Sequence, residues 1–257
     1  MIDLHSHLLP GLDDGSRSLA QSVTVLKNFV AAGVTDVAVT PHLRASEIAA
    51  NGEDSIGRRD WVLAELRDAA PDGMRLHPGF EIMLDEPLST EAVGDRRYAL
   101  AGSRYYLVEF PITVVGDLAT RILQQVARAG VRPLVAHPER YPLVSPRTVA
   151  AWRDVGAAIQ VDATTLTRPH TRGETARQLV ALGYADILAA DNHGDRRTMM
   201  TGRRFLEGRG AGEAASWLTI ENPRAILEDR ELVPVPQSRL KVGLMEWVRG
   251  WIRRETW

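Results

Sequence analysis

The stretch YYLVEFPITVVGDLATRILQQVARAGVRPLVAH, residues 105–137, predicts the fold of this chain. Residues 105–110 and 132–136 are short β-like runs, and the apolar residues of the segment between them, 118–129, recur at helical spacing. Gly130 follows that segment at the place where a helix C-terminal cap favours a positive φ. A strand, a helix, a glycine and a second strand make one βα repeat, which predicts a pair of parallel strands.

The same repeat extends along almost the whole chain. β-like runs occupy residues 1–5, 34–40, 74–80, 105–110, 132–136, 158–162 and 185–190, and predicted helices occupy residues 19–32, 61–70, 118–129, 148–155 and 175–182. Four of these helices are followed by Gly33, Gly130, Gly156 and Gly183. Seven such units favour an α/β fold in which a parallel sheet winds into a barrel, and an open doubly wound sheet is the structural alternative.

The chain is expected to form one barrel domain, residues 1–235, followed by a tail, residues 236–257. Residues 45–60 and 86–101 are interpreted as longer connections on the rim. The tail from Arg239 has one apolar helical face beside several arginines, and that face contains Leu244, Met245, Val248, Trp251 and Ile252. One interpretation is a terminal helix packed on the barrel or on a neighbouring subunit, and the other is a basic helix on a membrane surface.

Composition excludes several classes of function. A formal net charge of -2 gives no overall attraction for nucleic acid, and no segment is apolar over the length needed to cross a bilayer, so we expect a cytoplasmic protein. The chain has no cysteine. A thiolate nucleophile, a disulfide framework and any Cys-ligated metal site are therefore excluded, and a metal would have to bind His, Asp and Glu.

Side chains that ligate metals occur where the predicted strands end. His5 and His7 lie two residues apart, so on a strand they face the same side. The C-terminal ends of barrel strands are where active sites assemble, so residues at several strand ends should meet. With the aspartate of the first loop, the candidate ligands are His5, His7, Asp14, His42, Glu81, Glu109, His137, Asp191 and His193.

Nine such groups are too many for one ion. They suit two or three divalent cations such as Mn²⁺, Fe²⁺ or Zn²⁺, with a carboxylate bridging. A buried network of ion pairs without cations would carry heavy desolvation and repulsion costs. Asp13 and Asp162 rank below the nine, His77 is interpreted as a hydrogen-bonded core or bottom-face residue, and His170 as a solvated loop residue.

These motifs resemble a known superfamily. The order HxH, Asp in a PGxDDG loop, TPH, GFE, VEF, AHPER and a final DxH is similar to that of the polymerase and histidinol phosphatase (PHP) superfamily. Within it, the chain resembles the manganese-dependent bacterial protein-tyrosine phosphatases of capsule and exopolysaccharide operons, the CpsB/YwqE type. The resemblance extends from Met1 to about Leu227, and the acidic residues Asp14 and Glu109, where other members carry histidine, favour this type.

The resemblance implies a distorted (βα)7 TIM-like barrel that holds three divalent ions, Mn²⁺ before Fe²⁺ or Zn²⁺. His5, His7 and Asp191 match the ligands of one ion, and Glu81 matches the bridging carboxylate. Glu109 and His137 match the second ion. Asp14, His42 and His193 match the third.

The resemblance also implies residues that hold the substrate phosphate. Arg140 matches a family arginine of this role, Arg196 and Arg197 are both candidates for a second one, and Arg44 is a weaker candidate. The implied reaction is hydrolysis of a phosphomonoester by metal-activated hydroxide. Tyrosinate, whose conjugate acid has a pKa of about 10, leaves without a strong general acid.

The implied substrate is the phosphotyrosine-containing tail of a membrane tyrosine kinase that controls polysaccharide export. With the tail of this chain on the membrane, the barrel would lie at its inner face. A histidinol-phosphatase-like small-molecule phosphatase, or a phosphodiesterase of the same superfamily, is the alternative enzyme. A non-catalytic metal-binding regulator of a kinase is the alternative outside enzymes.

Overall fold

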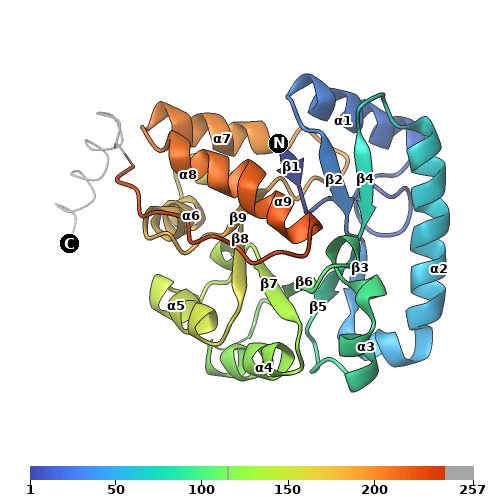
Figure 1. Cartoon of the computed structure of the whole chain (residues 1–257), viewed down its shortest axis with the longest axis horizontal. Coiled ribbons are helices and arrows are strands. Elements are labelled where there is room, and N and C mark those ends of the chain that lie inside the picture. Colours follow the sequence, from blue (N-terminus) through green and yellow to red (C-terminus); the bar gives the residue numbers. More distant parts are fainter. Residues whose placement is uncertain (115, 241–257) are drawn as a thin grey trace.

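The computed structural model describes residues 1–114 and 116–240 (Figure 1). The predicted helix in the tail lies outside the described residues, apart from Arg239 and Leu240. Residues beyond the predicted boundary at 235 still contact the barrel, because the Ser238 amide donates to the Ala181 carbonyl over 3.1 Å. The division into a domain and a tail therefore stays a prediction.

All paired strands run parallel, and neighbours in space follow the order of the chain. One sheet has the order β1 (Ile2–Asp3), β2 (Asp36–Val39), β4 (Arg75–Pro78). The other has the order β3 (His42–Arg44), β5 (Glu81–Met83), β6 (Tyr105–Glu109), β7 (Arg132–Ala136), β8 (Ala158–Asp162), β9 (Ile187–Ala189). The predicted α/β fold with parallel strands is confirmed.

Two of the seven predicted strands are each followed by a short further strand that was not predicted. The run 34–40 contains β2, and β3 begins just beyond that run; the run 74–80 contains β4, and β5 begins just beyond it. Pro41, which has no N–H to donate to a ladder, separates the first pair, and Gly79, where an added β-carbon would lie 2.9 Å from Leu100 and 3.2 Å from Thr40, separates the second. A bridge between Ser6 and Asn192 joins the ends of the first and last units, and the His7 amide donates to the Asn192 carbonyl over 2.8 Å.

Helices lie outside the strands (Figure 1). Their bounds are α1 Leu19–Ala31, α2 Ala45–Ala69, α3 Thr90–Gly94, α4 Gly116–Arg128, α5 Pro146–Asp154, α6 Thr171–Ala181, α7 Met199–Gly208, α8 Gly212–Ser216 and α9 Asn222–Leu227. The glycines that follow α1, α4, α5 and α6 all have positive φ, between 70° and 99°, as the punctuation of the sequence predicts. No helix of the described residues is long and apolar enough to cross a membrane.

The interpretation of residues 45–60 as a loop is wrong, because α2 begins at Ala45 and is 25 residues long. Gly52 and Gly57 weaken the helical pattern of the sequence in the first half of this helix, because glycine is a poor helix former. A side chain at Gly52 would collide with the Tyr98 hydroxyl, so glycine is required there by packing rather than by a turn. Ile48 and Ile56 are buried in the largest core cluster and anchor this half of α2.

The interior of the strand arrangement is filled by side chains of one parity. Leu107, Leu134 and Ala158 pack in one buried cluster with Ile2 and Ile187 from the first and last strands. Glu109 lies two residues after Leu107 on β6, so it shares the interior side and continues it toward the C-terminal end of the strand. The polar residues at the C-terminal ends of the strands lie directly above this apolar interior.

Candidate metal centre

The structure brings the nine predicted ligands together at the C-terminal side of the strands. His5 follows β1, His137 follows β7, and Asp191 and His193 follow β9. Two ligands are the first residues of short strands: His42 begins β3 and Glu81 begins β5. Glu109 is the last residue of β6. Asp14 lies in the loop between β1 and α1.

Glu81 is at the centre of the cluster and is 1% exposed. Its Oε2 lies 3.2 Å from His5 Nε2, 3.3 Å from His7 Nε2 and 3.0 Å from His42 Nδ1. Its Oε1 lies 2.9 Å from His137 Nε2. Burial would raise the pKa of Glu81, but the surrounding imidazoles outweigh burial and hold that pKa well below its ordinary value. One ionised carboxylate facing four imidazoles is the arrangement of a bridging ligand.

The first group of donors lies beneath Glu81 and contains His5, His7 and Asp191. The two histidine Nε2 atoms are 3.1 Å apart, and each lies 3.3 Å from Asp191 Oδ1. Two imidazole nitrogens that point at each other and at shared carboxylates form the donor pocket of a cation rather than a hydrogen-bonded pair.

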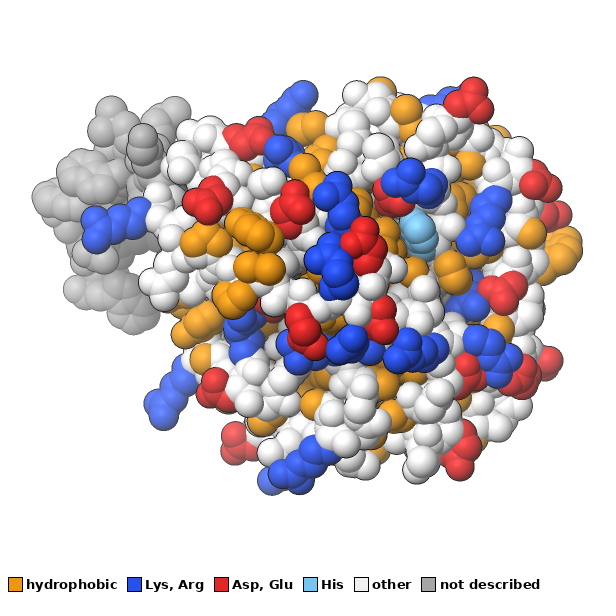
Figure 2. All heavy atoms as spheres, viewed as in Figure 1, with side chains coloured by type: hydrophobic (Ala, Val, Ile, Leu, Met, Phe, Trp, Pro, Cys, Tyr) orange, Lys and Arg blue, Asp and Glu red, His pale blue; other side chains and the backbone are white. Residues whose placement is uncertain are grey.

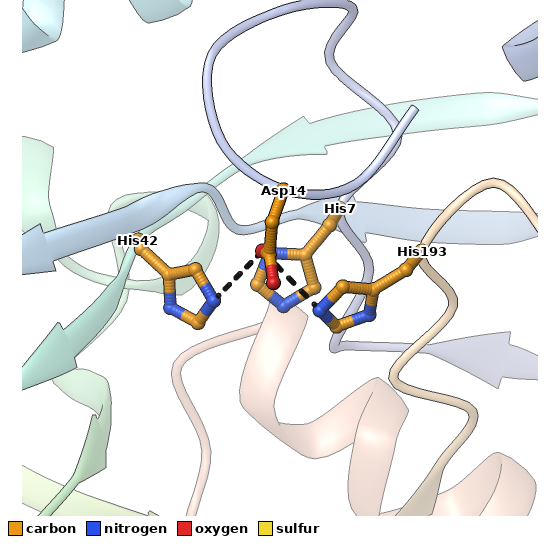
Figure 3. A group of neighbouring side chains, drawn as sticks. All are labelled: His7, Asp14, His42 and His193. Atoms are coloured by element: carbon orange, nitrogen blue, oxygen red, sulfur yellow. Dashed lines mark ion pairs between the residues drawn. The ribbon is translucent and has the colours of Figure 1, made fainter. Parts of the chain in front are cut away.

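His42, Glu109, Asp14 and His193 are more exposed than the first group, whereas His137 is buried beside Glu81. His42 Nδ1 is 3.5 Å from Glu109 Oε1, which joins these two residues to Glu81. Asp14 reaches over the histidines from its loop, with Oδ1 3.4 Å from His42 Nε2 and 3.5 Å from His193 Nε2 (Figure 3). Asp14 is 73% exposed, so this side of the cluster is open to a substrate.

The donor set fits divalent cations. Three sets of ligand atoms each lie within 4.8 Å of one another: His7, Asp14, His42 and His193; His5, His7 and Glu81; His42, Glu81 and Glu109. Two buried carboxylate oxygens, Glu109 Oε1 and Asp191 Oδ1, accept no hydrogen bond from the described residues. Buried carboxylate oxygens are costly to leave without a partner, and a coordinated cation removes that cost.

Side chains behind the ligands fix the orientation of the imidazole rings. Gln160 Oε1 lies 3.0 Å from His5 Nδ1, and Asp13 Oδ2 lies 2.7 Å from His7 Nδ1. Each contact leaves Nε2 free to face the cluster. In the sequence Asp13 ranks below the nine candidate ligands, and Gln160 is not among the residues predicted from it.

Two of the ligands have left-handed backbone conformations. The φ of His137 is 35° and that of Asp191 is 47°, a region that residues with a β-carbon rarely adopt. Both residues come directly after a strand, and the reversed backbone turns their side chains inward. Backbone strain of this kind persists where the surrounding structure holds it, and it is common at functional sites.

The candidate arginines differ in their placement. Arg140 Nη2 donates to Asp191 and, over 3.1 Å, to Asp162 Oδ2. Arg197 Nη1 lies 3.3 Å from Asp191 Oδ2, whereas Arg196 is exposed and forms no ion pair with the described residues. Arg44 is 60% exposed and its nearest carboxylate is that of Asp85, 3.9 Å away, outside the cluster.

The remaining histidines lie elsewhere. His77 Nε2 is 2.9 Å from Asp36 Oδ1 on the neighbouring strand, so it is a hydrogen-bonded residue as predicted. His170 is exposed immediately before α6.

Comparisons with known proteins agree on one family. The family model described as capsular polysaccharide synthesis, CpsB/CapC, matches residues 1–228. The chain is 25% identical over 242 residues to tyrosine-protein phosphatase CpsB of Streptococcus pneumoniae, which covers 90% of this chain and 99% of the relative. It is 25% identical over 253 residues to tyrosine-protein phosphatase YwqE of Bacillus subtilis, covering 94% and 97%.

Solved structures show the same fold. A structure from work on YwqE of Bacillus subtilis and CpsB of Streptococcus pneumoniae, described as unique metal-dependent tyrosine phosphatases, superposes with a TM-score of 0.76 at 24% identity, covering 93% of this chain and 100% of that one. An organophosphorus hydrolase from Deinococcus radiodurans superposes with a TM-score of 0.56 at 15% identity, covering 88% and 91%.

Proposed function

The chain belongs to the CpsB/CapC family of capsular polysaccharide synthesis, and from this membership we propose that it is a metal-dependent phosphomonoester hydrolase that acts on phosphotyrosine. The membership confirms the resemblance drawn from the motifs. The curated relatives are named tyrosine-protein phosphatases, which supports the same activity here.

The observation that carries the proposal is the convergence of nine imidazole and carboxylate side chains in one cluster, with Glu81 at its centre. We assign one ion to His5, His7 and Asp191, a second to Glu109 and His137, and a third to Asp14, His42 and His193, with Glu81 bridging. Manganese is the proposed metal, since imidazole and carboxylate donors suit it. When bound, these ions supply positive charge that polarises the phosphoryl oxygens and makes water a stronger nucleophile at neutral pH.

The arginines at the edge of the cluster are proposed to bind the phosphate. Arg140 contacts both of its carboxylates through Nη2, which leaves its other guanidinium N–H groups for phosphoryl oxygens. Arg197 contacts the same Asp191 oxygen and is preferred to Arg196 for this reason. Two guanidinium groups that hold a phosphate from different directions orient it for in-line attack.

The chemistry of the leaving group favours phosphotyrosine over phosphoserine as the substrate. No cysteine is present, so the phosphoryl group is transferred to water without a cysteinyl phosphate. A tyrosinate leaving group, with a conjugate acid of pKa about 10, needs little protonation as it departs. We further propose that the substrate is the phosphorylated tail of a membrane tyrosine kinase of capsule synthesis, reached from the inner face of the membrane.

A substrate panel tests the proposed activity. The Mn²⁺-loaded protein is assayed on p-nitrophenyl phosphate, a phosphotyrosine peptide, a phosphoserine peptide and histidinol phosphate, before and after EDTA. We expect hydrolysis of the first two, loss of activity with EDTA, recovery with Mn²⁺ and no effect of thiol alkylation. Faster hydrolysis of histidinol phosphate would replace phosphotyrosine as the substrate, and activity that survives complete metal removal would sink the proposal.

A further inference from the structure

A second cavity lies away from the metal centre, between α2 and the segment 96–102 that leads into β6. Its volume is about 540 Å³, within the range of small-molecule sites. It is lined by Arg59, Asp60, Leu63, Arg67, Pro78, Arg96, Arg97, Ala101 and Gly102, and we call it the arginine pocket. None of the nine predicted metal ligands lines it. Among the lining residues, Arg67 is in the last turn of α2 and Gly102 precedes β6.

The lining of the arginine pocket is positively charged. It contains four guanidinium groups and a single carboxylate, that of Asp60. Basic side chains are frequent on the face of the molecule that Figure 2 shows, where they form a band with acidic ones. Leu63 and Pro78 add apolar surface, so the pocket combines cationic side chains with an apolar wall, as sites for small organic anions do.

Arg59 is buried and held in place by hydrogen bonds, unlike an arginine at the surface. It is 2% exposed, its guanidinium lies 4.6 Å above the Phe80 ring, and its Nη1 donates to the Arg97 carbonyl over 2.6 Å. Burial lowers the pKa of Arg59, which shows what holding this cation away from water costs. Asp60 Oδ1 accepts from its Nε and Nη2. A buried guanidinium beside an open cavity is the arrangement expected where an anion binds.

The other three arginines are more exposed than Arg59. Arg97 pairs with Glu53, which is 77% exposed, and with Asp95, which is 24% exposed, and Arg96 pairs with Asp229 at the surface. Pairs with exposed partners such as Glu53 contribute little to stability, so exchanging them for a bound anion loses little. Arg67 donates Nε and Nη2 to the Leu76 carbonyl and forms no ion pair with a carboxylate of the described residues.

The wall opposite α2 has an unusual backbone. Ala101 has a φ of 52° and Gly102 one of 71°, and both line the pocket. A residue with a β-carbon rarely adopts such a φ, and an outlier of this kind indicates a local functional or packing demand.

We propose that the arginine pocket binds a small phosphorylated molecule with two or more negative charges, at a site separate from the metal centre. Guanidinium groups bind phosphate in a bidentate manner, and four of them around one cavity suit more than one phosphate group. This proposal does not depend on the proposed phosphatase activity, because the two sites share no residue.

Binding of inorganic pyrophosphate to the Mn²⁺-loaded protein tests the proposal. Titration calorimetry, with Mg²⁺ in excess so that the probe does not strip the protein of metal, compares the wild type with an Arg67→Gln/Arg96→Gln variant. The matched control is Arg58→Gln/Arg121→Gln, which removes the same charge from exposed positions outside the pocket. We expect binding at least about tenfold weaker in the pocket variant and unchanged in the control.

An Arg140→Gln variant separates the two sites. Pyrophosphate binding that persists in Arg140→Gln and is lost in the pocket variant supports the arginine pocket. Binding that is equal in the wild type and the pocket variant, and lost in Arg140→Gln, assigns all of it to the metal centre and overturns the proposal. Should the double variant unfold, Arg67→Gln alone changes one exposed side chain, and the same comparison applies. Hydrolysis of p-nitrophenyl phosphate should be unchanged in the pocket variants.

Discussion

At the scale of residues, the histidines depend on the groups behind them. Gln160 reaches His5 from the interior of β8, and its Oε1 accepts from Nδ1, which sets the tautomer that presents Nε2 to the cluster. The amide is fully buried. Its place two residues before Asp162, on the interior parity of the strand, makes it part of the site although it is not itself a candidate ligand.

Replacing Gln160 should therefore weaken metal binding without unfolding the chain. For Gln160→Leu we expect about 10- to 100-fold lower Mn²⁺ affinity, measured by competition with a chelating dye. Gln160→Glu keeps an acceptor for the Nδ1–H and should retain more affinity than Gln160→Leu. Equal Mn²⁺ affinity of Gln160→Leu and wild type would show that His5 does not need this partner.

A second residue-scale feature lies at the other end of the strands. The buried Asp36 carboxylate accepts from Arg75 through Nε and Nη2, both over 2.7 Å, and from His77 over 2.9 Å. Burial raises the pKa of Asp36, but the hydrogen bonds from Arg75, His77 and Thr35 outweigh it and lower the pKa from 3.8 to about 2.

The lowered pKa predicts a pH-dependent contribution to stability. Because the folded-state pKa lies below the unfolded value, the contribution is complete above pH 4 and is lost as the pH falls toward 2. Asp36→Asn should cost at most about 1 kcal/mol at neutral pH, since water screens the exposed Arg75. Urea unfolding of both proteins at several pH values checks this, and a difference that grows on acidification would contradict it.

The site residues that lie at strand ends could be predicted from the sequence. Eight of the nine candidate ligands could be selected because they lie at or just after the end of a β-like run, and Asp14 because it lies in the first loop; the structure brings all nine together. Gln160 could not be selected, because a buried amide in a strand has no sequence mark that distinguishes a ligand-orienting role. Arg196 and Arg197 could not be separated either, because the turn at Asp195 that directs one of them to Asp191 depends on hydrogen bonds within the loop.

At the scale of elements, α2 shows that a glycine required by packing can make the sequence of a helix resemble that of a loop. Its first half falls in residues 45–60, which were interpreted as a connection, and the two glycines there occupy different surroundings. A β-carbon at Gly52 would meet the Tyr98 hydroxyl, whereas nothing lies within 4 Å of one at Gly57. The helix therefore tolerates one glycine and requires the other.

Alanine at these two positions should change stability in opposite directions. Gly52→Ala should lower the free energy of unfolding by about 1–3 kcal/mol, because the side chain overpacks the contact with Tyr98. Gly57→Ala should raise it by roughly 0.5–1 kcal/mol, since alanine is the better helix former. Urea unfolding with an unchanged m-value measures both, and a stabilised Gly52→Ala would rule out the packing requirement.

Other elements were predictable to differing degrees. The helices capped by a glycine, such as α1 and α4, were located because a helical period and a positive-φ residue coincide. The strands β3 and β5 were not predicted, because each is only three residues long. Helices α7 to α9, residues 199–227, were not predicted either, because they are short and follow one another without the strands that mark the βα repeat elsewhere.

At the scale of the whole molecule, the candidate metal centre joins the first strand unit to the last. His5 and His7 come from the first, and Asp191 and His193 from the last, where the Ser6–Asn192 bridge also connects them. Cations at this place would hold the two ends of the strand arrangement together. Binding to the folded chain alone shifts the unfolding equilibrium toward the native state.

Metal removal should therefore lower thermal stability as well as activity. At Mn²⁺ about 100-fold above its Kd, one ion adds about 2.7 kcal/mol, and EDTA should remove that increment. Differential scanning calorimetry with and without Mn²⁺ measures the shift in Tm. Glu81→Gln, which removes the central carboxylate, should lose most of the shift, whereas Glu86→Gln, exposed in the same segment, should keep it. An identical Tm with and without Mn²⁺ would exclude this linkage.

The spacing of the ligands along the chain also has a consequence during protein synthesis. The ribosome produces His5 and His7 first, but Asp191 and His193 only after some three quarters of the 257 residues. Until then the nascent chain lacks Asp191, one of the two carboxylates that His5 and His7 share, and a product that ends before His193 cannot contain the whole donor set. A complete metal centre can therefore form only after the chain has been translated and folded as far as its last strand, β9.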